Sequence, residues 1–188
     1  MKAAVLHAPR QPMTIEEVAI AKPKRREVLV RTAAAGLCHS DLHFIEGAYP
    51  TPMPTVLGHE SAGVVEAVGE QVTYLKPGDH VIGCLSVFCG HCEYCRKGMY
   101  SHCLDGGWIL GHRIDGTQAE YVRVPHADFS LHHLPDNADE EALTMLSDIL
   151  PTGFECGVLT GKVQPGCSVA IVGSGPIGLA ALMTAQFF

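Results

Sequence analysis

Short runs of alternating hydrophobic and polar residues fill most of the chain before Pro135 and predict β-strands. The expected strands cover residues 3–7, 14–20, 27–35, 61–68, 80–82 and 118–124. They are rich in aliphatic and β-branched residues and are separated by turn signals such as Pro77-Gly78-Asp79. One or two helical turns are expected over residues 38–46, ending at Gly47. So many short strands at close spacing predict a small all-β barrel or sandwich.

The pattern changes after Pro135. The acids Asp139, Glu140 and Glu141 predict the start of a helix, where negative charge suits the positive end of the helix dipole. This helix is expected to reach Pro151, and a second to cover residues 152–159. A buried strand is predicted over residues 168–172, followed by a glycine-rich turn and an apolar helix. Because one strand cannot bury both faces of a parallel sheet, we expect a truncated α/β domain or one completed by a partner.

Composition excludes several classes of protein. The 188 residues include 47% hydrophobic side chains, and 13 Lys and Arg against 20 Asp and Glu give a formal net charge of −7. This content excludes wholesale disorder, and the acidic balance argues against a nucleic-acid partner. The apolar run near Met1 is too short for a signal peptide, and glycines and a proline interrupt residues 170–188. We expect a cytoplasmic protein with no membrane partner.

Four of the eight cysteines lie close together, at Cys89, Cys92, Cys95 and Cys103. A structural zinc ion is held by four such ligands, and glycines beside the cluster allow the tight loop that it needs. Without a secretory signal, zinc is favoured over disulfides. A nucleic-acid zinc finger is the competing interpretation, and the net charge opposes it. The other three cysteines are interpreted as ordinary buried thiols: Cys84, Cys156 and Cys167.

A second set of metal-ligating side chains is distributed along the chain. Cys38 precedes His39-Ser40-Asp41, and His59 stands between Gly58 and Glu60. A catalytic zinc ion takes three protein ligands and leaves one position open, and Asp148 is the natural third ligand. A lone Cys or His is also common in a protein core, so the spacing leaves both interpretations open.

The order of these motifs resembles that of a known family. From Met1 to Phe188 the chain resembles the N-terminal half of the zinc-dependent medium-chain alcohol dehydrogenases. The resemblance rests on Gly36-Leu37-Cys38-His39-Ser40-Asp41-Leu42-His43, Gly58-His59-Glu60, the four-cysteine lobe, Asp148 before Pro151-Thr152-Gly153, and Gly173–Gly178. It implies an α+β chain: a GroES-like β-barrel catalytic domain over residues 1–150 with both zinc sites, then the start of a Rossmann domain over residues 151–188.

The resemblance also implies a role for each matching position. Cys38, His59 and Asp148 match the ligands of the catalytic zinc, and Cys89, Cys92, Cys95 and Cys103 match those of the structural zinc. Glu60 matches an acid beside the catalytic metal. Ser40 matches the hydroxyl that hydrogen-bonds the substrate oxygen, and His43 matches the next proton acceptor. His39 and Thr152 match positions beside the cofactor pyrophosphate and the nicotinamide. Trp108 resembles a substrate-pocket residue, and a role as a packing anchor stays equally open.

The sequence Gly173-Ser174-Gly175-Pro176-Ile177-Gly178 fits the dinucleotide fingerprint. After a strand and before a helix, Gly173, Gly175, Pro176, Ile177 and Gly178 let backbone N–H groups approach a pyrophosphate. The residue that separates NAD from NADP is expected about 20 positions further on, beyond Phe188. NAD is the more frequent cofactor of similar enzymes, and NADP stays open.

These observations predict hydride transfer between a small alcohol and its aldehyde or ketone, with NAD or NADP and two zinc ions per chain. A full-length member of the family is expected to be a homo-oligomer, and the 188-residue chain alone is expected to be nearly inactive. One alternative is a polyol or amino-alcohol dehydrogenase, which shares the metal motifs. A zinc-free quinone reductase would not need the cysteine lobe. The alternative from another class is a truncated zinc-binding fragment without catalytic activity.

Overall fold

The computed structural model describes residues 1–188 and divides them into two compact units, Met1–Thr144 and Met145–Phe188. The sequence predicts a division after residue 150. The boundary between the two units lies after Thr144, six residues earlier. Each unit is stabilised largely by contacts within itself. The first contains every strand of the protein, and the second is helical.

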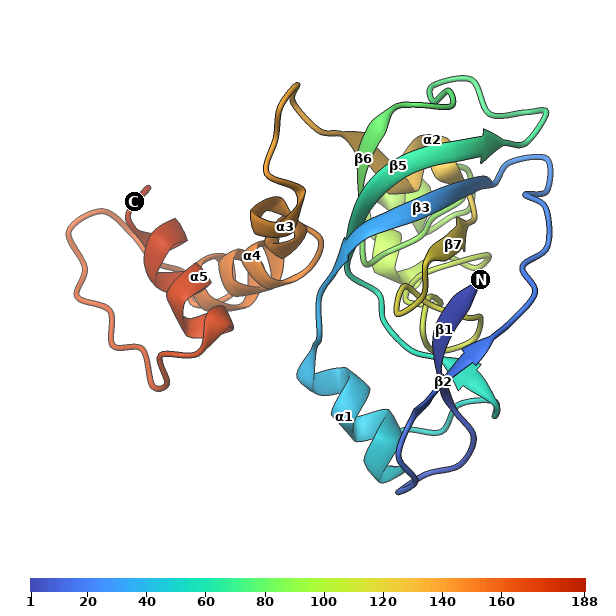
Figure 1. Ribbon diagram of the computed structural model, residues 1–188. Coiled ribbons are helices and arrows are strands. Elements are labelled where there is room, and N and C mark those ends of the chain that lie inside the picture. The colour runs from blue at the N-terminus through green and yellow to red at the C-terminus, as the bar shows by residue number, and fades with distance from the viewer. The chain divides into compact units, whose positions relative to one another are not determined.

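The first unit is built from two antiparallel sheets, as the alternating pattern predicts (Figure 1). A three-stranded sheet has the order β2-β1-β4, and a five-stranded sheet has the order β7-β3-β5-β6-β8. The strands are β1 (Lys2–Leu6), β2 (Thr14–Glu17), β3 (Val28–Ala35), β4 (Thr55–Val56), β5 (Ser61–Val68), β6 (His80–Gly83), β7 (Tyr121–Val124) and β8 (Leu131–His133). The sequence pattern missed β4 and β8, because two or three residues are too few to show an alternation.

The core of the first unit lies on one face of the larger sheet. Side chains two positions apart on a strand share a face, so Val28 and Val30 of β3 both point inward and are 0% and 2% exposed. They pack in one cluster with Val65 of β5, Val81 of β6 and Val122 of β7. These five valines, from four strands, fill the core because β-branched side chains pack well on the pleated surface of a sheet.

Helix α1 (His39–Glu46) begins and ends as expected, with Cys38 as its N-cap and Gly47 as its C-cap. The Asp41 carboxylate accepts a hydrogen bond of 3.1 Å from the backbone N–H of Cys38, which closes the first turn. Four shorter helices complete the first unit: the 3-10 turns η1 (Cys95–Lys97) and η2 (Tyr100–His102), and the α-helical turns α2 (Ala127–Ser130) and α3 (Glu140–Leu143).

The expected single helix from Asp139 to Pro151 is wrong, because the chain breaks it into α3, the 3-10 turn η3 (Thr144–Leu146) and α4 (Ile149–Thr152). Asp148 leaves helical geometry with φ −143° and ψ −57° and becomes the N-cap of α4. Pro151 does not end a helix, since it lies in the first turn of α4, where no partner is needed for its missing N–H. The π-helical segment η4 (Gly153–Leu159) follows directly, and α5 (Pro176–Ala185) ends the second unit.

The strand predicted over residues 168–172 is also wrong. This segment joins no sheet, since both sheets consist of strands from the first unit. Val172 is fully exposed, and Val169 and Ile171 are 47% and 38% exposed. A strand is stabilised by hydrogen bonds to a neighbour, and none lies beside this one, so its apolar sequence alone does not make it a strand.

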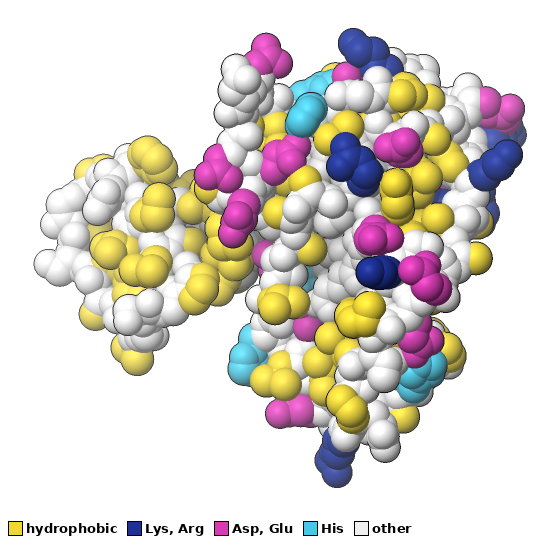
Figure 2. All heavy atoms as spheres, in the orientation of Figure 1, with side chains coloured by type: hydrophobic (Ala, Val, Ile, Leu, Met, Phe, Trp, Pro, Cys, Tyr) yellow, Lys and Arg dark blue, Asp and Glu magenta, His cyan; other side chains and the backbone are white.

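The second unit carries many apolar side chains on its surface (Figure 2). On α5, Leu179, Leu182 and Met183 are 48%, 49% and 60% exposed, and Phe187 beyond it is 84% exposed. No helix in the structure has both the length and the apolar content of a membrane span.

Substitution of Phe44 tests how much its packing contributes to the stability of the first unit. Its ring is 1% exposed and packs with Leu6 and Leu57. Because a cavity would remain, we expect Phe44→Ala to lower the free energy of unfolding by about 3–5 kcal/mol. Leu42→Ala on the same helix is the matched control, since Leu42 is 40% exposed and should change stability little. Urea denaturation of both variants measures the difference, and equal losses would contradict this account of the packing.

Candidate metal centres and cofactor turn

The four-cysteine lobe brings its sulfur atoms together in the first unit. The four Sγ atoms lie within 4.8 Å of one another, and all eight cysteines of the chain are free thiols. Four thiolates at about 2.3 Å from one tetrahedral zinc ion would lie about 3.8 Å apart. The Cys92–Cys95 and Cys89–Cys95 sulfur pairs are 3.4 Å and 3.9 Å apart. These separations match a shared metal ion and are too long for a disulfide bond.

The thiols of the lobe differ in how readily they ionise. The backbone N–H of Cys95 donates to the sulfur of Cys92 at 3.5 Å, and this contact is the main cause that lowers the pKa of Cys92 to about 6. Burial is the main cause that raises the pKa of Cys95 to about 12. A second thiolate beside the first is disfavoured without a cation. A bound dication would remove that penalty, so the lobe is electrostatically suited to a metal.

Cys38, His59 and Glu60 form a second group of donors within the first unit. Their ligand atoms lie within 4.8 Å of one another, and His59 and Glu60 are 2% and 0% exposed. His59 Nε2 is 3.7 Å from Glu60 Oε1. A hydrogen bond with His59 is the main cause that lowers the pKa of the Cys38 thiol. A half-buried thiol, a buried imidazole and a buried carboxylate at these separations are ligands that zinc accepts.

Two glycines make room for this group. Gly58 has φ +99°, and a Cβ there would lie 2.5 Å from the Thr117 hydroxyl oxygen. A Cβ on Gly36 would lie 2.3 Å from Glu60 Oε2. A side chain at position 36 would push against Glu60, and one at position 58, next to His59, would push against Thr117 and Gln118. The glycines beside the motifs therefore belong to the site as much as the ligating residues do.

The carboxylate of Asp41 lies on the Nδ1 side of the His59 imidazole. Its Oδ1 is 3.8 Å from His59 Nδ1, and its Oδ2 accepts hydrogen bonds from Cys38 N and from Gln118 Nε2 at 3.1 Å and 3.0 Å. Burial raises the pKa of Asp41. Carboxylates behind ligating histidines commonly fix the ring orientation. No role is predicted from the sequence for Asp41 or Gln118. The capping spacing from Cys38 to Asp41 was a usable signal, and Gln118 gave none.

Ser40 and the aromatic residues lie around the same donors. The Cys38 thiol donates to the Ser40 hydroxyl oxygen at 3.5 Å. The Trp108 ring is 5.4 Å from that of His59 and 5.7 Å from that of Phe44, centroid to centroid. Its indole N–H is buried without a hydrogen-bond partner. Trp108 therefore packs against Phe44, as a packing anchor would, and also borders the donor group; its place in a substrate pocket stays a prediction.

His39 and His43 lie one turn apart on α1, with ring centroids 4.9 Å apart in an edge-on contact. The ring of His43 also lies 5.1 Å from that of Tyr49. Residues four apart on a helix share a face, so α1 presents both imidazoles together.

The second unit holds the remaining predicted residues. The Thr152 hydroxyl donates a hydrogen bond to Asp148 Oδ1, which ties the last residue of α4 to its N-cap. A cavity of about 540 Å³ is lined by the glycine turn, from Gly173 to Gly178, together with Cys156 and Ile171 among others. A Cβ on Gly178 would lie 2.0 Å from the carbonyl oxygen of Gly173, so the start of α5 packs tightly on the turn.

The three other cysteines do not share one environment. Cys156 and Cys167 are exposed, which contradicts the expectation of buried thiols, and Cys84 is half-buried. The burial of an apolar thiol depends on a neighbouring layer. Both exposed cysteines lie in the second unit, beside the apolar segment that has no sheet to pack against.

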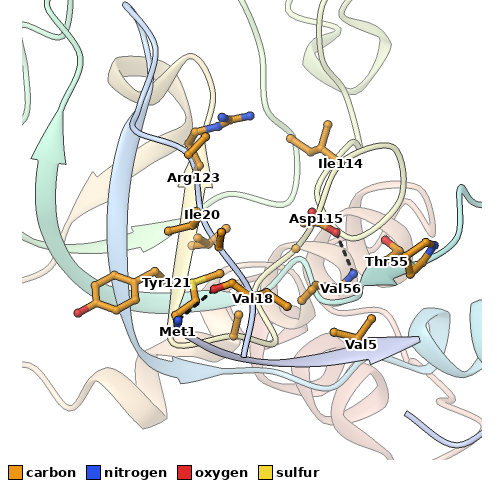
Figure 3. Close-up of a pocket in the computed structure, with 16 residues that line it drawn as sticks. Met1, Val5, Val18, Ile20, Thr55, Val56, Ile114, Asp115, Tyr121 and Arg123 are labelled. Atoms are coloured by element: carbon orange, nitrogen blue, oxygen red, sulfur yellow. Dashed lines mark hydrogen bonds between the residues drawn. The ribbon is translucent and has the colours of Figure 1, made fainter. Parts of the chain in front are cut away.

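A separate cavity of about 480 Å³ opens in the first unit between β1, the segment after β2 and the start of β7 (Figure 3). Met1 donates from its ammonium group to the Val18 carbonyl at 3.0 Å, and the Val56 N–H donates to Asp115 Oδ1 at 3.0 Å. Its lining is mainly apolar and contains no His or Cys. It offers no metal-ligating group comparable with the two described above.

The low pKa of Cys92 gives a direct test of the lobe. In zinc-free protein, we expect iodoacetamide to alkylate Cys92 faster than the other cysteines of the lobe, with a rate that rises through about pH 6, because the thiolate is the nucleophile. Zinc should protect all four sulfurs, while the exposed Cys156 and Cys167 stay reactive. Peptide mass spectrometry over a pH series measures each site. Equal modification with and without zinc would contradict a metal site in the lobe.

Comparison with known proteins agrees with this geometry. The alcohol dehydrogenase GroES-like domain family matches residues 24–136. An S-(hydroxymethyl)glutathione dehydrogenase of Escherichia coli is 40% identical, and the match covers 98% of this chain and 55% of that protein. The chain therefore spans about half the length of the curated relatives that it matches.

Solved structures give the same result. The apo form of zinc dependent alcohol dehydrogenase 2 from Streptococcus pneumonia is 51% identical with a TM-score of 0.92, covering 100% of this chain and 53% of that one. An alcohol dehydrogenase from Thermus sp. ATN1 is 40% identical with a TM-score of 0.92, covering 100% and 55%. A zinc-binding dehydrogenase from Sinorhizobium meliloti, solved with NADP, is 31% identical with a TM-score of 0.87, covering 99% and 53%. With its GroES-like domain and the beginning of a Rossmann domain, the chain belongs to the zinc-dependent medium-chain alcohol dehydrogenase family.

Proposed function

We propose that this chain provides the zinc-binding half of an alcohol dehydrogenase, which transfers hydride between a small alcohol and a nicotinamide cofactor. The observation that carries the proposal is the donor group of Cys38, His59 and Glu60 beside the Ser40 hydroxyl, in which the imidazole and the carboxylate are buried. Beside an ion with an open position, the same hydroxyl can bind a substrate oxygen.

The proposed metal content is two zinc ions per chain. Cys38, His59 and Asp148 would hold the catalytic ion, with Glu60 as an additional acid beside it, and Cys89, Cys92, Cys95 and Cys103 would hold the structural ion. The donor types suit both assignments: four thiolates close a structural site, and three mixed ligands leave a position open. When bound at the open site, zinc supplies a Lewis acid that lowers the pKa of a coordinated oxygen.

Ser40 and His43 would handle the proton of the alcohol. A hydroxyl can donate and accept a hydrogen bond and carries no charge, so Ser40 can hold the substrate oxygen without competing for the metal. His43 lies three residues further along α1, on the same side of the helix, and an imidazole can accept a proton near neutral pH. His39, which is in edge contact with His43, would lie beside the cofactor pyrophosphate.

The second unit would contribute to the cofactor site. The turn from Gly173 to Gly178 leads into α5, whose first free N–H groups suit a pyrophosphate. Gly175, Pro176 and Ile177 would contact this group, and Thr152 would lie beside the nicotinamide ring. We propose NAD as the cofactor, with NADP as the alternative because the relative from Sinorhizobium meliloti is described as bound to NADP.

The substrate class is a small alcohol with its aldehyde or ketone. Trp108 beside His59 limits the space and offers a buried N–H that a substrate oxygen could use. A polyol dehydrogenase is the second candidate, because galactitol-1-phosphate dehydrogenase from Escherichia coli is 33% identical with a TM-score of 0.86. We propose that the protein acts as a homo-oligomer in the cytoplasm, without nucleic-acid or membrane partners.

Metal content tests the proposal first. Elemental analysis of protein purified without added zinc should give two zinc ions per chain, falling to one in Cys38→Ala. Cys95→Ala should also lose one ion, from the lobe. Cys167→Ala is the matched control, since that thiol is exposed and outside both groups, and it should retain two ions. A single zinc ion that is unaffected by Cys38→Ala would overturn the catalytic site.

Alcohol-dependent reduction of NAD or NADP, followed by nicotinamide absorbance, separates the enzyme from the non-catalytic alternative. In a full-length dehydrogenase that contains this half, removing the hydroxyl in Ser40→Ala should lower kcat by about 10²–10⁴-fold while both zinc ions remain bound, since a proton-transfer partner contributes an effect of that size. Two zinc ions without hydride transfer in that unsubstituted full-length protein would favour a zinc-binding role without catalysis. Unchanged turnover in Ser40→Ala would remove the proposed proton path.

A further inference from the structure

We propose that Gln118 is a positioning residue for the catalytic metal site, acting through Asp41 on His59. The inference rests on the proposed function, since it concerns the metal held by Cys38 and His59. Gln118 reaches Asp41 from the segment before β7, which is 77 residues away in sequence.

The backbone of Gln118 is held from two directions. Its N–H donates to the Leu57 carbonyl at 3.0 Å, and its carbonyl accepts from the N–H of Ala4 in β1 at 3.0 Å. The preceding Thr117 N–H donates to the Gly58 carbonyl, also at 3.0 Å. The segment that carries Gln118 is therefore hydrogen-bonded directly to the turn that presents His59.

The side-chain amide of Gln118 is oriented by its hydrogen bond to Asp41. Nε2 donates to Asp41 Oδ2 at 3.0 Å, and the other amide atom, Oε1, is buried without a partner. Turning the amide over would place Oε1 against the carboxylate, bringing two acceptors together. The amide is thus oriented by Asp41, and it leaves one buried acceptor unsatisfied to maintain that contact.

Through Asp41, the hydrogen bond from Gln118 orients the imidazole of His59. Oδ2 is occupied by the Cys38 N–H and by Gln118, which leaves Oδ1 as the oxygen 3.8 Å from His59 Nδ1. Oδ1 is buried, and its separation of 3.8 Å from Nδ1 is an ion-pair distance longer than a hydrogen bond. Two donors on Oδ2 restrict rotation of the carboxylate. The Nε2 side of His59 then stays directed toward Glu60 and the metal position.

Gln118→Met tests the inference, because methionine keeps an unbranched side chain of similar length and removes the donor. Partners behind metal ligands typically change metal affinity 10–100-fold, and Gln118 lies one contact further away, so we expect zinc to bind about 10-fold more weakly at the Cys38–His59 site. Gln118→Glu should weaken binding further, because a carboxylate would face Oδ2 of Asp41. Gln71→Met is the matched control, since Gln71 is exposed in the same unit.

The readout is zinc affinity from competition with a chromogenic chelator, with the four-cysteine lobe as an internal reference. Cys38→Ala identifies which of the two binding steps belongs to the catalytic site. The inference predicts a selective loss at that site, with lobe affinity and the Tm of the metal-free protein unchanged. An affinity equal to that of the unsubstituted protein, or an equal loss at both sites, would overturn it while leaving the proposed function intact. Absence of any step sensitive to Cys38→Ala would overturn both.

Discussion

Burial of ionisable groups at one point is the constraint on which the rest of the first unit depends. Glu60, His59 and Asp41 are 0%, 2% and 5% exposed, and they adjoin the half-buried thiol of Cys38. Removing such groups from water costs several kcal/mol each unless hydrogen bonds or a cation compensate. The local structure provides compensation through the cap of α1 and the segment paired with the His59 turn. A zinc ion would supply the positive charge that this group of acids and a thiol otherwise lacks.

The two metal centres meet this constraint in different ways. The lobe places its four sulfurs on a short loop and buries three of them at 1%, 6% and 7% exposure, with the loop backbone supplying donors. The Cys38–His59 group instead draws on α1, the turn before β5 and the segment before β7, which are far apart in sequence. The lobe is therefore a local structure, whereas the second group exists only when the sheets have formed around it.

Sequence patterns were sufficient where a signal is local. The alternation in Val28–Ala35 and Ser61–Val68, the glycine that ends α1 and the cysteine spacing of the lobe all depend on neighbouring residues. They failed where a distant partner decides the outcome. Residues 168–172 have the composition of a strand but no strand beside them, and Asp148 interrupts a helix that composition alone would continue. Gln118 is a clear case of this kind, since nothing in its neighbourhood indicates that its amide reaches Asp41.

The lack of space for a side chain at Gly36 and Gly58 affects how related sequences should be compared. A methyl group at either position would meet Glu60 Oε2 or the Thr117 hydroxyl oxygen at 2.3 Å or 2.5 Å. A homologue could therefore retain every ligating side chain and still lose the ion, through a substitution that adds one carbon atom next to a motif. Assigning metal dependence across such sequences requires checking these two glycines as well as the ligands. A relative with alanine at either position should be regarded as a candidate for a changed chemistry.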